Sequence, residues 1–135
     1  SPVEYASMET LLSSCPEKAI LLVLDQIHHP RNLGMLLRTA ACVGVAGVVL
    51  TARGGALMDE DVLRASAGAV FHVPIAIAIN AAQTLRDLRE YGFWTYALDA
   101  EAENSVFAVR WADRTAPCRA EGLRYARANT LGEGF

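Results

Sequence analysis

Three residues with the chemistry to act on a charged substrate lie at short, fixed spacing. Asn32, Gly34 and Arg38 form the pattern Asn-x-Gly-x-x-x-Arg. Side chains on a helix lean toward its N-terminus, so the Arg38 guanidinium can extend over Gly34 toward the amide of Asn32. An amide and a permanent cation would then converge at a helix start, where exposed backbone amides attract anions. The pattern therefore predicts a site for an anion such as phosphate.

A plainer interpretation of the same residues stays open. Asn32 is a favoured residue for capping a helix N-terminus. Arg38 stands off the apolar stripe of the helix and would be an ordinary solvated charge. Gly34 would then be incidental, and the three residues would share no function.

The elements that must position this segment are a buried strand and an amphipathic helix. The apolar run 19–24 ends at Asp25 and is typical of a strand covered on both faces. Pro30 disfavours helix at the residue before it, so we expect the helix to begin at Asn32 and to run to about Val43. In open α/β sheets, ligands bind at the carboxyl ends of the strands, which is where this loop lies.

The rest of the chain continues the alternation of strand and helix. We expect further strands over 47–51, 73–79 and 93–98, and further helices over 59–69 and 81–91. Such alternation predicts an α/β fold, with a mostly parallel sheet and helices on both faces.

Composition narrows the class of protein but does not select a function. The 135 residues suffice for one domain, and 53% hydrophobic with 20% charged residues is a globular composition. The net charge of −3 gives no bulk attraction for nucleic acid, so any RNA contact must come from a local patch. We expect no metal site, because the histidines lack ligand companions at useful spacing.

Cysteine use and the N-terminal residues bear on the compartment. The three cysteines are far apart, and Cys42 lies in an apolar helical stretch where a buried free thiol is expected. The first 14 residues lack the charged and apolar regions of a signal peptide. We therefore expect a reduced, cytoplasmic setting.

The segment from Leu24 to Ala40 resembles the first motif of the SpoU-type (TrmH-like) RNA 2′-O-ribose methyltransferases of the SPOUT superfamily. The match comprises Asn32, Gly34, Arg38, Thr39 and Ala40, after a strand ending in Leu24-Asp25. The stretch 64–69 is similar to the family's Ser-x-Gly-Ala segment. The opening 2–7 resembles the linker before the catalytic domain in the rRNA guanosine methyltransferase branch. The likeness covers roughly residues 2–112.

This resemblance implies a knotted α/β fold, S-adenosylmethionine as methyl donor, and transfer to a ribose 2′-hydroxyl of rRNA or tRNA. It implies that Arg38 stabilises phosphate and the developing oxyanion, and that Asn32 positions Arg38 or the RNA. It further implies a homodimer in the intact family member. The remaining residues that it suggests are Glu121 as a third catalytic residue, Arg31, Gly34, Thr39 and Ser66 for substrate binding, and Gly122 and Leu123 for cofactor binding.

The C-terminal end departs from the family pattern. Pro117 and Arg119 stand where the next buried strand is expected, and only 120–123 remains of the second motif. The third motif is absent. We therefore expect a trefoil knot that is incomplete in this chain, and weak binding of S-adenosylmethionine. The expected organisation is a linker from an upstream RNA-binding domain (1–17), the N-terminal part of a SpoU-type methyltransferase domain (18–113) and a divergent tail (114–135).

Two other functions compete with a methyltransferase. A non-catalytic RNA-binding or dimerisation module could keep only the substrate face of this family. A receiver-like or nucleotide-binding α/β protein is disfavoured, because no Gly-x-Gly-x-x-Gly follows the first strand and no P-loop occurs.

Overall fold

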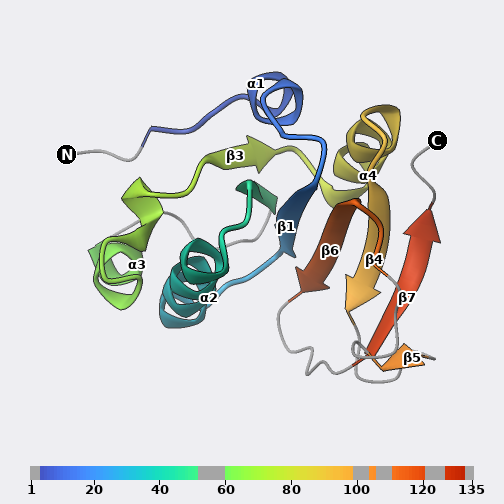
Figure 1. Cartoon of the computed structure of the whole chain (residues 1–135). Helices are drawn as coiled ribbons and strands as arrows, with labels where there is room; N and C mark the ends of the chain where they lie inside the picture. The colour runs from blue at the N-terminus through green and yellow to red at the C-terminus, as the bar shows by residue number, and fades with distance from the viewer. Residues whose placement is uncertain (1–3, 52–59, 99–103, 106–110, 121–126, 133–135) are drawn as a thin grey trace.

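The computed structural model of the chain describes residues 4–51, 60–98, 104–105, 111–120 and 127–132. Helices and strands alternate over most of this length (Figure 1). Along the chain the elements are α1 (Met8–Ser13), β1 (Ala19–Asp25), α2 (Pro30–Val43), β2 (Gly47–Thr51), α3 (Glu60–Ala65), the 3-10 helix η1 (Ala69–Phe71), β3 (Ile75–Ala78), α4 (Ala81–Glu90), β4 (Trp94–Leu98), β5 (Asn104–Ser105), β6 (Arg114–Ala120) and β7 (Arg127–Gly132).

The described strands form one sheet in the order β3-β2-β1-β6-β4-β7-β5. The first five in this order are parallel to one another. At one edge of the sheet, β7 pairs antiparallel with β4, and β5 pairs antiparallel with β7. β1 lies between β2 and β6, which explains its continuous apolar sequence. The mostly parallel sheet expected from the sequence is confirmed.

Helices cover both faces of the sheet, as predicted. On one face, Leu33 and Leu37 of α2 and Val62 of α3 pack with residues of β1, β2 and β3. On the other face, Leu11 of α1 and Leu88 of α4 pack against a second set of buried strand residues. The sheet thus separates two apolar cores, and α2 and α3 lie together on the same face (Figure 1).

Pro117 and Arg119 were expected to break the strand after Asp113, and this expectation is wrong. Residues 114–120 form β6, which pairs parallel with β1 on one side and β4 on the other. The pairing with β1 passes from Ile20 and Thr115 to Val23 and Cys118, so the ladder is interrupted where Pro117 lacks an amide. Arg119 takes part through its backbone, opposite Leu24.

Arg114 supplies a physical reason why this strand docks in the sheet. Its guanidinium lies 5.0 Å from the centroid of the Phe93 ring and donates hydrogen bonds to the carbonyl oxygens of Tyr91 and Cys15. Ala116 is fully buried in the core that contains Phe93. A charged residue at the strand start is therefore stabilised by a ring and two carbonyls, which the sequence pattern alone does not reveal.

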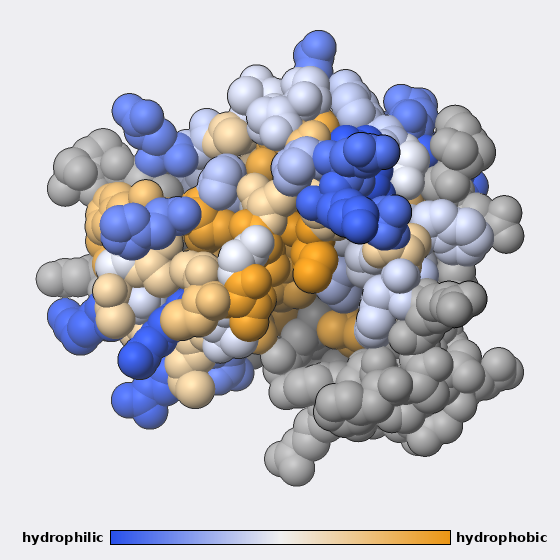
Figure 2. Space-filling view, in the orientation of Figure 1, coloured by the Kyte–Doolittle hydropathy of each residue, from blue (hydrophilic) through white to orange (hydrophobic). Residues whose placement is uncertain are grey.

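Apolar surface remains exposed on one side of the molecule. Figure 2 shows hydrophobic residues gathered over β1 and the neighbouring part of α2. Ile20 of β1 is 46% exposed, and Met35 and Val43 of α2 are also exposed. Exposed apolar surface of this kind often marks a contact region.

Three further features concern the described residues: the exposure of Cys42, membrane-spanning helices and metal-binding clusters. Cys42 is exposed, so its predicted burial is wrong: it lies on the outer side of α2, one residue before the helix ends at Val43. No helix among the described residues is long and apolar enough to cross a bilayer. Within the same residues, no group of three histidine, cysteine or acidic side chains is placed to hold a metal ion.

Candidate functional site

The loop that leaves β1 is held by a short hydrogen-bond network. Gln26 adopts a left-handed backbone conformation with φ of 53°, which is uncommon for a residue other than glycine. Its amide donates to the hydroxyl of Thr51 at 3.1 Å, and that hydroxyl donates to the carboxylate of Asp25 at 2.9 Å. Thr51 at the end of β2 thereby fixes the turn that leads into α2.

Helix α2 begins earlier than the sequence predicted. His29 is its N-cap, without a side-chain capping bond, and Pro30 occupies the first helical position. Pro30 suits this position because its missing amide would have no partner there and its φ is already helical. Asn32 is therefore not the N-cap but a residue of the first turn. The backbone amides of the first turn point toward the carboxyl edge of the sheet, where they favour an anion.

Asn32, Arg38 and Thr39 are all exposed on α2. Among the described residues, no ion pair or hydrogen bond engages the Arg38 side chain, so no acidic neighbour holds it in a structural role. The hydroxyl of Thr39 donates to the carbonyl of Met35 at 3.0 Å within the helix. Arg38 is thus a solvated cation available to a ligand.

The earlier start of α2 also places Arg31 in the helix. Residues seven apart are rotated by only about 20° and separated by about 10.5 Å along the axis, so Arg31 and Arg38 share one face. Asn32 and Arg38 are six apart and lie about 120° from one another around the helix. Helical geometry therefore aligns Arg38 with Arg31 more closely than with Asn32.

Gly34 is buried against α3, which explains why a glycine stands at this position. A Cβ atom at this position would lie 2.5 Å from Ala65 Cβ and 2.9 Å from the carbonyl oxygen of Val62. The missing side chain thus allows α2 and α3 to pack in close contact. This contact gives Gly34 a packing role, whereas the path of the Arg38 side chain over Gly34 stays a prediction.

Ser66 directly follows α3 and is buried. Its side chain is fully buried, and its hydroxyl donates to the carbonyl of Leu63 at 3.0 Å. Because the Ser66 side chain is buried and its hydroxyl already donates to a backbone carbonyl, the structure does not bring Ser66 together with Arg38.

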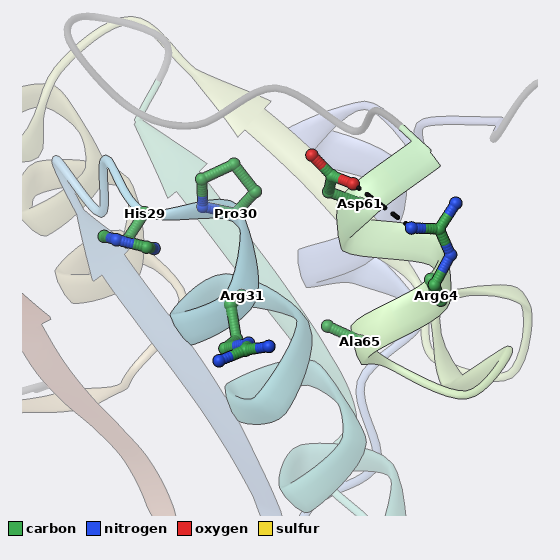
Figure 3. Close-up of a pocket in the computed structure, with 6 residues that line it drawn as sticks. All are labelled: His29, Pro30, Arg31, Asp61, Arg64 and Ala65. Atoms are coloured by element: carbon green, nitrogen blue, oxygen red, sulfur yellow. Dashed lines mark ion pairs between the residues drawn. The ribbon is translucent and has the colours of Figure 1, made fainter.

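A pocket of about 410 Å³ opens beside the first turn of α2 (Figure 3). Its size falls within the range of small-ligand sites, roughly 300–1,000 Å³. α2 and the residue before it contribute one wall and α3 the other. The lining residues are His29, Pro30, Arg31, Asp61, Arg64 and Ala65.

Sequence reasoning selected Arg31 but missed Thr51 and Arg64. Thr51 is the last residue of β2 and lies beside Asp25, the last residue of β1. The sequence could have indicated Thr51, because neighbouring parallel strands end at the same edge of the sheet. Arg64 lies in the stretch matched to the Ser-x-Gly-Ala segment, but its approach to Arg31 depends on how α3 packs.

The proposed residues Glu121, Gly122 and Leu123 lie outside the described residues. The strand before them is described to its last residue: Ala120 pairs with Asp25, which ends β1. The chain therefore leaves β6 at the same edge of the sheet where the β1–α2 loop begins.

The thiol of Cys118 lies near this edge. Burial and, to a smaller extent, the negative charge of Asp25 together raise its pKa to about 12. A thiol with this pKa stays protonated at neutral pH and is a poor nucleophile. Cys118 is therefore a packing residue rather than a catalytic one.

Fold and site together define a class of protein. A five-stranded parallel sheet presents a Gln26 turn, an exposed helix start and a solvated arginine at its carboxyl edge, the position at which α/β proteins bind ligands. Residues 19–118 match the SpoU rRNA Methylase family. The chain belongs to this family.

Individual relatives support the same assignment. The chain is similar to the 23S rRNA (guanosine-2′-O-)-methyltransferase RlmB of Xanthomonas campestris, with 39% identity over 102 residues, covering 76% of this chain and 41% of that protein. It therefore spans about two-fifths of the length of this curated relative. The family match to residue 118 includes the first five residues of the segment expected to be a divergent tail.

Solved structures match the fold. The AdoMet-bound rRNA methyltransferase from Sinorhizobium meliloti superimposes with a TM-score of 0.76 at 24% identity, covering 88% of this chain and 45% of that chain. The SpoU methyltransferase AviRb from Streptomyces viridochromogenes gives 0.77 at 16% identity, covering 87% and 47%. These likenesses confirm the SPOUT-type α/β architecture.

Proposed function

We propose that the protein transfers a methyl group from S-adenosylmethionine to a ribose 2′-hydroxyl of rRNA or tRNA. The observation that carries the proposal is the exposed Arg38 on α2, beside the carboxyl edge of the sheet and within the segment matched by the family. RlmB of Xanthomonas campestris, a 39% identical relative, is a guanosine-2′-O-methyltransferase of 23S rRNA.

The chemical difficulty is that a ribose hydroxyl is a weak nucleophile at neutral pH. The hydroxyl must be held in line with the methyl group, and the negative charge that develops on its oxygen must be stabilised. A guanidinium keeps its proton in proteins, so Arg38 acts as a hydrogen-bond donor and cation rather than as a base. Arg38 thus stabilises the reacting oxygen or the adjoining phosphate.

Other residues complete the proposed site. Arg31, Asn32 and Thr39 are exposed on α2 and can contact the RNA. By the family resemblance, we assign Glu121 to catalysis, and Gly122 and Leu123 to the methyl donor. A substrate contact by Ser66 would require its hydroxyl to leave the carbonyl of Leu63, so we assign that residue to packing.

Two further proposals concern the setting of the protein. We infer that the intact family member is a homodimer, as the family resemblance implies, and that exposed apolar surface on β1 and α2 supports subunit contact. We also place the protein in the cytoplasm, where rRNA and tRNA are modified. Sedimentation of the purified protein tests the first inference.

The experiment that tests the function measures methyl transfer from radiolabelled donor to total rRNA and tRNA. In a version of the protein that carries the family's complete C-terminal motifs, Arg38→Ala should lose at least about 100-fold in rate, the scale seen when a stabilising donor is removed. Its melting temperature should change by no more than about 2 °C, because the side chain is exposed.

Arg86→Ala is the matched control. Arg86 is exposed on α4, on the opposite face of the sheet, where its guanidinium donates to Gln83. This variant should keep the wild-type transfer rate. Undiminished transfer by Arg38→Ala, or equal loss in both variants, would reject the assignment of Arg38.

A further inference from the structure

The pocket between α2 and α3 gathers positive charge from two separate helices. Arg31 comes from the first turn of α2 and Arg64 from the last turn of α3, and both line the cavity of about 410 Å³ (Figure 3). The close contact at Gly34 and Ala65 keeps the two helices together at this level. Arg31 precedes Gly34 by one turn, and Arg64 adjoins Ala65, so the helix contact itself brings the two arginines to one cavity.

We propose that this cavity, the two-arginine pocket (His29, Pro30, Arg31, Asp61, Arg64 and Ala65), binds one backbone phosphate of the RNA near the nucleotide that Arg38 addresses. The proposal rests on the proposed function and assigns Arg64 to substrate binding. Guanidinium groups bind phosphate through paired, charge-assisted hydrogen bonds. The shared helix face of Arg31 and Arg38 places the pocket and the reacting site along one line.

The charges of the described lining residues favour an anion, although Asp61 is one of them. Asp61 lies 3.5 Å from Arg64, and the two side chains are 69% and 72% exposed. An ion pair this exposed contributes little free energy, because water screens both charges. Asp61 therefore does not cancel the attraction of Arg64 for phosphate. With His29 neutral, the lining has a net formal charge of +1. The free amides at the start of α2 add further partial positive charge.

The proposal also explains how an acidic protein can hold RNA. The whole chain has a net charge of −3, so phosphate contacts must be local. A small cavity lined by two arginines provides such a contact without a broad basic surface. It would fix the position of the strand, while base recognition occurs elsewhere.

The first test measures the salt dependence of RNA affinity by fluorescence anisotropy with a short single-stranded RNA of mixed sequence. Each phosphate contact contributes about 0.7 to the slope of log affinity against log salt for a single strand. Arg64→Gln should therefore lower the slope by about 0.7, and Arg64→Lys should restore much of it. Arg86→Gln, an exposed arginine on the far helix α4, should leave the slope unchanged.

The second test uses inorganic phosphate as probe and follows backbone amide NMR signals at constant ionic strength. Phosphate should shift the signals of Arg31 and Ala65 in the wild type and leave them unmoved in Arg64→Gln. Asp61→Asn should tighten phosphate binding, because it removes a carboxylate from the described lining of the pocket. An unchanged or weaker affinity in Asp61→Asn would count against the pocket.

These measurements separate the pocket from the proposed function. An unaltered salt slope in Arg64→Gln, or no RNA binding by the wild type at low salt, overturns the phosphate pocket, whatever the methyl-transfer assay shows. A reduced slope and lost phosphate shifts in Arg64→Gln support it. If Arg38→Ala then still transfers methyl groups at the wild-type rate, the assignment of Arg38 fails while the pocket stands. Equal melting temperatures of all variants exclude unfolding as the cause.

Discussion

The hydroxyl of Thr51 donates a hydrogen bond of 2.9 Å to the carboxylate of Asp25 and links the ends of two neighbouring parallel strands. The same hydroxyl accepts from the amide of Gln26, whose left-handed conformation turns the chain toward α2. One threonine side chain therefore positions the loop on which the helix start, Arg31 and Arg38 depend.

The first prediction concerns this threonine. Thr51→Val keeps the shape of the side chain but removes both hydrogen bonds, leaving the Gln26 amide and an Asp25 oxygen without this partner. We expect the free energy of unfolding to fall by about 1–3 kcal/mol. Urea denaturation measures it. The control is Thr39→Val on the exposed face of α2, which should change stability by no more than about 0.5 kcal/mol. Equal stability of both variants would contradict the role of Thr51.

The second prediction concerns the contact between α2 and α3. Gly34→Ala should destabilise the protein by about 1–2 kcal/mol, although alanine is the better helix former, because the added methyl group meets Ala65 Cβ and a backbone oxygen. Ala65→Gly added to this variant should recover part of the loss. Thermal unfolding of the single and double variants tests the contact. A stabilised Gly34→Ala would show that the helices can separate at no cost.

The third prediction concerns thiol reactivity. Cys42 is exposed and should react with a thiol reagent at pH 8 in the folded protein. Cys118 should react only after unfolding, because its pKa is raised to about 12, chiefly by burial and then by the charge of Asp25. Mass spectrometry of alkylated peptides distinguishes the two. Alkylation of folded Cys118 at the rate of Cys42 would contradict its burial.

The same thiol predicts how stability depends on pH. The Cys118 pKa is higher in the folded protein than the ordinary thiol pKa of 9.0 that it has in the unfolded protein, so the unfolded state loses its proton first. The contribution of this thiol to the free energy of unfolding is fully present below pH 9 and should be lost as the pH rises toward about 12. Cys118→Ala should show a shallower decline over this interval when denaturation is followed at each pH. An identical decline in both proteins would exclude a contribution from Cys118.

The fourth prediction concerns the methyl donor. We expect this chain to bind S-adenosylmethionine far more weakly than the Sinorhizobium meliloti methyltransferase, because its residues after Asp113 depart from the family's second and third motifs and a small-ligand site needs enclosing apolar surface. Isothermal titration of both proteins provides the comparison. Saturable heat in the micromolar range for this chain would show that its C-terminal residues build a complete donor pocket.

The sequence by itself determined the strands and helices from β1 to β4 and the family motif on α2. The apolar run 19–24 predicted β1 because a strand covered on both faces needs no polar residues, and the leucines of α2 predicted its buried side by their spacing. The pattern at Asn32, Gly34 and Arg38 indicated the family, and the match over 19–118 confirmed it. These features are local, so neighbouring residues suffice to reveal them.

Only the tertiary structure decided the features that depend on distant partners. β6 forms although it contains Pro117, because Arg114 is held by Phe93, Tyr91 and Cys15, residues far away in the sequence. Gly34 faces α3, and Arg64 reaches the same pocket as Arg31, because two helices pack closely. No local pattern records such contacts, since each depends on which surfaces meet once the sheet has assembled.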